Sequence, residues 1–155
     1  TISENFADVK LLIAGTGALE SELKEQVSAL HLSRQVEFLG YSKEVGAYMA
    51  NSDVIVVPSV SEGFGVVFLE AFSAKTPVVS WDVPAGNELI ENGKSGYLVK
   101  PYEVSELAKQ ITEVLMNSDN QELIVEQAYL RLKSYFKRDR MIDETIMFYE
   151  KVIQS

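Results

Sequence analysis

The sequence predicts one α/β domain over residues 1–155, with a doubly wound, mostly parallel sheet and a helical C-terminal tail. Short apolar runs alternate with longer segments of helical spacing, which is typical of a parallel sheet covered by helices on both faces. After Pro101 only the helical pattern continues. The chain has 155 residues, enough for one domain with a hydrophobic core and too few for two.

Five short runs are predicted to be strands. Several are rich in Val and Ile and apolar throughout, as strands are when both faces of a parallel sheet are buried. The sequence therefore predicts five parallel strands in one sheet. They span residues 9–15, 36–40, 53–59, 76–82 and 96–101.

Seven segments carry apolar residues at helical spacing. Four of them separate the strands and three form the tail. The last tail segment places six apolar residues on one stripe, as an amphipathic helix does. The four inner helices are expected at 18–30, 43–52, 65–75 and 86–93, and the tail helices at 104–117, 120–136 and 139–153. The stripe consists of Met141, Ile142, Ile146, Tyr149, Val152 and Ile153.

Composition excludes several classes of function. The net charge of −9 disfavours binding to nucleic acid, which requires Lys and Arg to displace counterions, and disfavours binding to an anionic membrane. The absence of cysteine excludes disulfides and thiolate metal sites, and no His or Asp cluster has metal-ligand spacing. The apolar runs are too short to span a membrane, and the first ten residues do not resemble a signal peptide.

The stretch "PSVSEGFGVVFLEAF" at 58–72 reads as the end of a strand, a glycine turn and a helix. Ligands of open α/β sheets bind at the carboxyl ends of strands, where helix N-termini point. Gly63 and Gly65 allow the backbone to approach a ligand closely, and the first amides of the helix are free to hold an anion such as phosphate. A plain strand–helix turn would have the same sequence, and this alternative stays open.

Glu70 is the one carboxylate in this apolar helix. At 100° per residue it points between Val66 and Ala74, opposite Phe68 and Phe72, and it leans toward the helix N-terminus. We expect it to be buried, so that it needs hydrogen-bond donors, and the vicinal diol of a ribose supplies two. In the alternative it reaches solvent or pairs with a Lys or Arg.

Other candidates are less distinctive. Glu62 either stabilises a helix N-terminus or faces the ligand. The segment "FLGY" at 38–41 ends a strand and either flanks a flat base or only turns the chain, and "LIAGTGALE" at 12–20 is an incomplete phosphate-loop pattern. His31 is interpreted as a favourable charge at a helix C-terminus, and Trp81 as a core residue that could also wall a pocket.

These residues resemble the C-terminal, donor-binding lobe of the retaining GT-B glycosyltransferases (group 1), a Rossmann-like half of the GT-B fold. "VKLLIAGTGALESELKEQVSAL", "VEFLGY", "DVIVVPSVSEGFGVVFLEAFSAKTPVV", "GNELIENGKSGYLV" and "VSELAKQITEVL" follow in the family's order and spacing. The resemblance covers about residues 9 to 150. Its most specific part is a Glu-x7-Glu motif, which runs here from Glu62 to Glu70.

The resemblance implies a hexosyltransferase-type enzyme that transfers a sugar from a UDP-, GDP- or ADP-sugar to an acceptor hydroxyl with retention of configuration, needing neither metal nor cofactor. Glu70 would hold the ribose hydroxyls, and Glu62, the implied catalytic residue, would contact the sugar near the reacting carbon. The sugar and diphosphate would be held by backbone amides of Gly63, Phe64, Gly65 and Val66. The base would be flanked by Leu39, Gly40 and Tyr41.

Some parts of the family's pattern are not represented in this sequence. They are the N-terminal acceptor lobe and the lobe's first, central strand with its Arg- and Lys-bearing loop. We therefore expect this chain to be inactive alone. Its sheet would have a rearranged centre, borrow a strand from a neighbouring molecule by self-association, or belong to a longer protein. Asn87 replaces a common proline, which makes the start of that helix uncertain.

The resemblance also implies a cytoplasmic protein that acts in polysaccharide, glycan or glycolipid synthesis, with peripheral attachment to the inner membrane face in its full-length form. Two alternatives remain. The chain is a non-catalytic nucleotide or nucleotide-sugar binding or regulatory module, which the missing phosphate-neutralising cations favour. The weaker alternative is a receiver-like domain, for which Asp82 is the one loose phospho-acceptor candidate.

Overall fold

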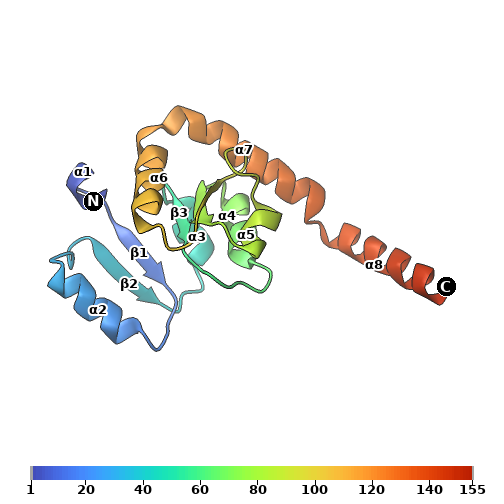
Figure 1. The fold of residues 1–155 in the computed structure, drawn as a ribbon, viewed down its shortest axis with the longest axis horizontal. Coiled ribbons are helices and arrows are strands. Elements are labelled where there is room, and N and C mark those ends of the chain that lie inside the picture. The colour runs from blue at the N-terminus through green and yellow to red at the C-terminus, as the bar shows by residue number, and fades with distance from the viewer. Residues whose placement is uncertain (1, 155) are drawn as a thin grey trace.

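A computed structural model describes residues 2–154, apart from the side chains of residues 118–120. All five predicted strands are present, each within its predicted range, and they pair in parallel (Figure 1). The α/β class is therefore confirmed. The strands are β1 (Leu11–Ala14), β2 (Val36–Gly40), β3 (Ile55–Val57), β4 (Val78–Trp81) and β5 (Tyr97–Val99).

The predicted helices are confirmed within a few residues. The sequence pattern gave no sign of α1, a single turn at the N-terminal end. α5 begins earlier than expected, because Pro84 occupies its first turn, where a missing N–H costs nothing. The helices are α1 (Ile2–Asn5), α2 (Glu20–Ala29), α3 (Val45–Ala50), α4 (Val66–Ala74), α5 (Pro84–Leu89), α6 (Val104–Met116), α7 (Ser118–Tyr135) and α8 (Arg138–Ile153).

The five strands form two separate parallel sheets. β1 pairs with β2, and the second sheet has the order β3–β4–β5. Among the described strands β1 makes no ladder with β3, so each of these two strands has an unpaired edge. The prediction of one continuous sheet with a rearranged centre is therefore wrong. No described strand fills the central position between β1 and β3.

The three-stranded sheet carries the core on both of its faces. On one face α4, α5 and α7 pack around a cluster of buried residues from Val57 to Ala128 that includes Phe68 and Phe72, both 0% exposed. On the other face α6 covers Val79, Trp81 and Val99. All four residues of β4 are buried, which matches the prediction of a strand covered on both faces.

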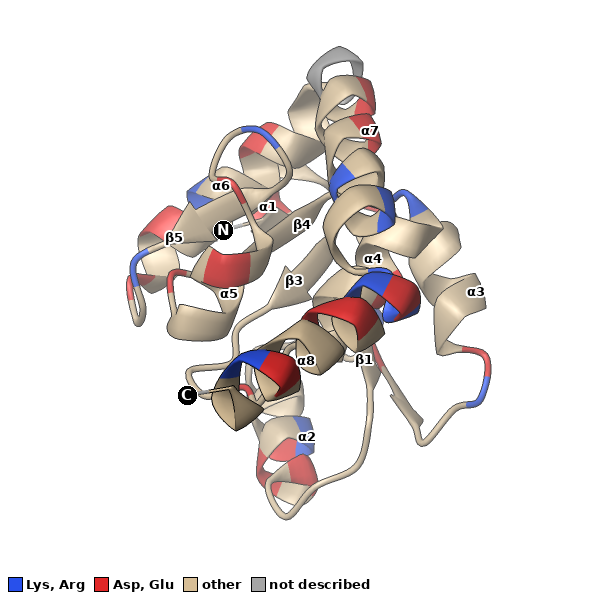
Figure 2. Ribbon diagram, turned by 90° about the vertical axis from the view of Figure 1, so that its right-hand side faces the viewer, with Lys and Arg blue, Asp and Glu red and all other residues tan. Residues whose placement is uncertain are grey.

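Polar contacts inside this core are satisfied. The buried Ser80 hydroxyl lies 3.0 Å from the Val57 carbonyl, so β4 is tied to β3 by a side chain as well as by the ladder. The buried Thr76 hydroxyl donates to the Met49 carbonyl at 2.7 Å and joins the start of β4 to α3. Figure 2 shows charged residues on the outer helices and loops, while β3, β4 and β5 carry none.

The β1–β2 sheet and α2 lie to one side of this core (Figure 1). Leu11 is 49% and Leu12 is 37% exposed, although β1 is apolar throughout. The burial that its apolar sequence indicates is therefore not found for β1, because neither a neighbouring strand on its open edge nor a helix layer covers it.

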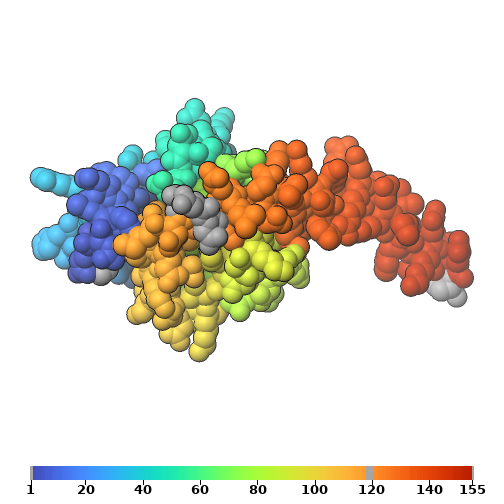
Figure 3. Space-filling view, turned by 90° about the horizontal axis from the view of Figure 1, so that it is seen from above, coloured from blue at the N-terminus to red at the C-terminus, as the bar shows by residue number. Residues whose placement is uncertain are grey.

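Helix α8 extends from the body at the opposite end (Figures 1 and 3). It follows α7 after Phe136 and Lys137, and the extended backbone of Lys137 marks the break. None of its residues is buried, and the predicted apolar stripe is exposed to solvent. Ile153 is 83% and Met147 is 66% exposed.

Candidate functional site

The glycine loop lies between β3 and α4, at residues 58–65, as the sequence predicts. Gly65 has φ of +77°, a left-handed conformation that side-chain-bearing residues rarely adopt. A Cβ at this position would lie 2.6 Å from Cδ2 of Phe68 and 3.2 Å from Cδ1 of Leu89. Both neighbours are buried, so the loop requires glycine at Gly65.

Gly63 lies in open space, where an added Cβ would meet nothing within 4 Å. The backbone N–H groups of Gly63, Phe64, Gly65 and Val66 donate to no acceptor in the described part of the chain. The Phe68 amide donates to the Gly65 carbonyl at 3.0 Å and closes the first turn of α4. The loop and the helix N-terminus together therefore present four unpaired amides, three of them on the exposed residues Gly63, Phe64 and Val66 and the fourth on the buried Gly65.

Glu70 lies on the exposed face of α4 together with Val66, which is 58% exposed. Phe68 and Phe72 are on the opposite, buried face, so the predicted direction of Glu70 is confirmed. Its predicted burial is wrong, because no described element packs over that side of the helix. Within the described residues Glu70 has no hydrogen-bond or ion-pair partner, and its assignment to a ribose stays a prediction.

Glu62 is half-buried and precedes the two glycines. Its carboxylate also has no partner among the described side chains and amides. The motif thus supplies one unpartnered carboxylate in the loop and another on the second turn of α4. Neither is neutralised by a cation of the described residues, so both remain available to a ligand.

The residues predicted to flank a base lie at the carboxyl end of β2. Gly40 has φ of +62°, and its carbonyl accepts a hydrogen bond from the Gly15 amide at 2.8 Å. Leu39 is half-buried, whereas Tyr41 is 79% exposed. The segment belongs to the β1–β2 sheet, while the glycine loop follows β3, so the two halves of the predicted site come from the two separate sheets.

Three lesser candidates also have definite places. His31 follows α2 with φ of +57°, at the helix C-terminus as expected. Trp81 is 5% exposed within the core under α6, so it is a core residue. Asp82 is exposed after β4, and its amide donates to the Val99 carbonyl at 2.7 Å.

Sequence reasoning missed the side-chain contacts that support the loop. The ring of Phe64 lies edge-on to that of Phe136, with centroids 6.5 Å apart and an interplanar angle of 72°. Arg131 of α7 donates to the carbonyls of Leu89 and Glu88 at the end of α5. Helical spacing places Arg131 on α7 but gives no signal for partners about forty residues away.

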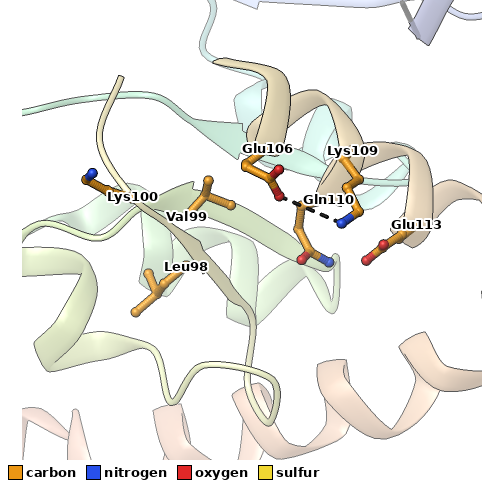
Figure 4. A pocket seen from close by; sticks show the side chains of 7 residues that line it. All are labelled: Leu98, Val99, Lys100, Glu106, Lys109, Gln110 and Glu113. Atoms are coloured by element: carbon orange, nitrogen blue, oxygen red, sulfur yellow. Dashed lines mark ion pairs between the residues drawn. The ribbon is translucent and has the colours of Figure 1, made fainter. Parts of the chain in front are cut away.

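Two shallow hollows lie elsewhere on the surface. The first, of about 250 Å³, lies between β5 and α6, and its lining includes Lys100 and the ion pair of Glu106 with Lys109 (Figure 4). The second, of about 190 Å³, lies between the α5–β5 loop and α7. Neither contains a predicted site residue. The described residues hold no cluster with the composition of a metal site, and none of their helices is long and apolar enough to cross a membrane.

Known proteins share this fold and sequence pattern. The family described as "Glycosyl transferases group 1" matches residues 1–131. N-acetyl-alpha-D-glucosaminyl L-malate synthase of Bacillus anthracis is 28% identical over 148 residues, which cover 96% of this chain and 39% of that protein. The chain thus spans well under half the length of this relative.

Solved structures agree with this match. The Anabaena protein Alr3699/HepE, solved in complex with UDP, superposes with a TM-score of 0.81 at 28% identity, covering 90% of this chain and 41% of that one. The C-terminal domain of a glycosyl transferase group 1 family protein (LpcC) of Francisella tularensis has a TM-score of 0.79 at 25% identity, covering 88% of this chain and 74% of that one. The chain therefore belongs to the glycosyl transferases group 1 family, and its fold is that of the C-terminal lobe of a GT-B glycosyltransferase.

Proposed function

We propose that this lobe binds a nucleotide-diphospho-sugar for a retaining, metal-independent transfer of the sugar to an acceptor hydroxyl. The observation that carries the proposal is the set of four unpaired amides from Gly63 to Val66, with the unpartnered carboxylates of Glu62 and Glu70 on either side. Backbone amides at a helix N-terminus bind phosphate oxygens and complement their charge through the helix dipole. In a transferase the same amides stabilise the departing diphosphate.

Each carboxylate has a part in this proposal. Glu70 accepts hydrogen bonds from the two ribose hydroxyls, and because it has no partner among the described residues, no internal contact has to be displaced first. Glu62 precedes the amides and contacts the sugar near the reacting carbon. Leu39, Gly40 and Tyr41 flank the base from the β1–β2 sheet. The UDP complex of the Anabaena relative makes UDP the first nucleotide to test, ahead of GDP and ADP.

In the whole protein we propose a hexosyltransferase of polysaccharide, glycan or glycolipid synthesis. The acceptor glycan or lipid is bound by a second lobe, and the enzyme works in the cytoplasm with peripheral attachment to the inner membrane face. Neither a metal nor a cofactor takes part in the proposed transfer: the amides and the helix dipole meet part of the diphosphate charge, and cations from outside this stretch of chain meet the rest. Nucleic acid is not a partner, since the chain carries a net charge of −9.

One observation favours a second function, a non-catalytic nucleotide-binding or regulatory module. No Lys or Arg occurs between Glu44 and Ala74, so the strand, loop and helix of the site carry no cation of their own. A nucleoside diphosphate would then bind with the negative charge of its diphosphate group only partly neutralised. The transferase proposal requires those cations from outside this stretch of chain.

Glu70→Gln is the direct test of the donor site. The change keeps the shape of the side chain but removes the charge-assisted hydrogen bonds, each of which contributes about 1.5–3 kcal/mol. We expect UDP affinity, measured by calorimetry, to fall at least about tenfold. Glu150→Gln on exposed α8 is the matched control and should bind as the unmodified protein does. Unchanged affinity in the Glu70 variant would show that Glu70 does not hold the ribose.

Transfer itself is the second arm of that test. The full-length protein is expected to give a product with the donor's anomeric configuration, read by proton NMR, with undiminished rate in EDTA. This 155-residue chain is expected to bind nucleotide without turnover. Tight UDP binding by a full-length protein that transfers no sugar from any UDP-, GDP- or ADP-hexose would favour the module instead.

We also propose that the lobe alone self-associates at its split sheet. The edges that β1 and β3 leave open have unpaired backbone groups, and such edges accept strands from other chains. Sedimentation velocity should show a dimer whose population rises with concentration. Leu12→Lys introduces a charge into the exposed part of β1 and should shift the population to monomer. A monomer at every concentration would contradict this proposal.

A further inference from the structure

We propose that Arg131 is a positioning residue that holds the glycine loop in its ligand-binding shape from behind. The proposal rests on the proposed function of the loop, and it assigns a role to a side chain that does not itself reach a ligand. Arg131 lies on α7, more than sixty residues from Gly63 in the sequence. Its side chain is 20% exposed, so it is largely enclosed between elements.

The guanidinium first fixes the end of α5. Its Nε donates to the Leu89 carbonyl at 2.8 Å and its Nη2 donates to the Glu88 carbonyl at 2.9 Å. Nη1 donates to Oε1 of Glu91 at 2.7 Å. The last carbonyls of a helix lack partners within the helix, and a cation there also complements the dipole. Arg131 thus caps α5 from a neighbouring helix.

The same guanidinium also lies against the aromatic residues that end α7. Its Cζ is 6.0 Å from the ring centroid of Phe136 and 5.4 Å from that of Tyr135. Contacts at this distance between a cation and a ring are attractive. Arg131 therefore restrains the Phe136 ring, which is the ring that meets Phe64 of the glycine loop at 6.5 Å.

The loop is consequently supported at two adjacent residues. Phe64 rests on Phe136, and Gly65 lies against Leu89, whose Cδ1 would be 3.2 Å from a Cβ added to that glycine. Phe64 is 56% exposed, so its contact with the Phe136 ring is a large part of its anchoring. Arg131 is bonded to the backbone of one support and lies against the other. Both supports, which also pack in the hydrophobic core, are therefore contacted by a single side chain.

Arg131→Met is the test, because methionine retains the length of the side chain without its charge or its planar fork. The order parameters of the Phe64 and Gly65 amides, measured by 15N relaxation in the protein without ligand, should fall from about 0.85 to below about 0.6. Those of β4 should not change, since the core is untouched. UDP affinity should fall about fivefold, within the range for coupled neighbours. Arg131→Lys, which keeps the charge and loses the fork, should resemble Arg131→Met.

Arg140→Met is the matched control. Arg140 also lies against Tyr135, at 5.0 Å, and pairs with Glu144, but it reaches neither α5 nor Phe136 in the contacts of the described residues. It should leave the loop order parameters and UDP affinity unchanged. Equal loop order in Arg131→Met and the unmodified protein, or equal loss in Arg140→Met, would overturn the proposal.

A second variant keeps the test decisive if Arg131→Met does not fold. Phe136→Leu removes the ring edge that Phe64 contacts while it keeps a large apolar side chain, and it should lower the same two order parameters. If the order parameters of Phe64 and Gly65 stay unchanged in this variant, the proposed support of the loop through the Phe136 ring is overturned. If the unmodified protein fails to bind UDP, the donor site fails, and the order parameters alone still decide whether Arg131 positions the loop.

Discussion

Gly65→Ala is expected to destabilise the protein by about 2–4 kcal/mol and to abolish binding of a nucleotide diphosphate. The backbone of Gly65 has φ of +77°, which costs a residue with a Cβ roughly 1–2 kcal/mol. The new methyl group would lie 2.6 Å from Cδ2 and 2.8 Å from Cε2 of Phe68, which is fully buried. Because that ring has no room to retreat, the loop and the start of α4 must move instead.

Gly63→Ala is the matched control for this change. A Cβ at Gly63 meets nothing within 4 Å, and its φ is not in the left-handed region. We expect its unfolding free energy in urea to stay within about 0.5–1 kcal/mol of the unmodified protein. Similar losses at both positions would show that the packing around Gly65 is not what fixes the loop.

Phe72→Ala is expected to lower the free energy of unfolding by about 3–5 kcal/mol. Phe72 is 0% exposed and packs with Val57, Ala71 and Val78 between α4 and the sheet. Removing the ring loses its transfer free energy and leaves a cavity that helix and sheet cannot close fully. An effect of this size is a large part of the stability of a typical domain.

Phe148→Ala is the matched control for Phe72→Ala, because it truncates the same type of residue at an exposed position. Phe148 lies on α8 and is 63% exposed, so truncating it should change the free energy of unfolding by no more than about 0.5 kcal/mol. Both variants are measured by urea unfolding at equilibrium, with the slope checked for two-state behaviour. A small loss at Phe72 would mean that α4 is not held to the sheet as the structure indicates.

Most of the fold could be predicted from the sequence because its signals are local. The apolar runs of β3, β4 and β5 and the periodicity of α6 depend on neighbours in the chain. α1 was missed because its four residues are too few to show a period. The division into two sheets could not be read from the strands themselves, since hydrogen-bond partners between distant strands leave no mark in a single sequence.

The features of the candidate site likewise divide into local ones, which the sequence shows, and long-range ones, which it does not. The spacing of Glu62 and Glu70 and the glycine at Gly65 are local. The structure explains that glycine by its left-handed backbone and its contact with Phe68. The burial of Glu70 was predicted wrongly, because a helical wheel gives the direction of a side chain and not what covers it. Arg131 was missed, since its bonds to Leu89 and Glu88 cross 42 and 43 residues of chain.

The projecting α8 has a mechanical consequence. At 1.5 Å per residue its 16 residues form an arm of about 24 Å, so a rotation of about 20° at its base displaces its tip by about 8 Å. The break between α7 and α8 at Lys137 is next to Phe136, whose ring contacts that of Phe64. A change in the angle between α7 and α8 would therefore move residues directly adjacent to the Phe64–Phe136 contact.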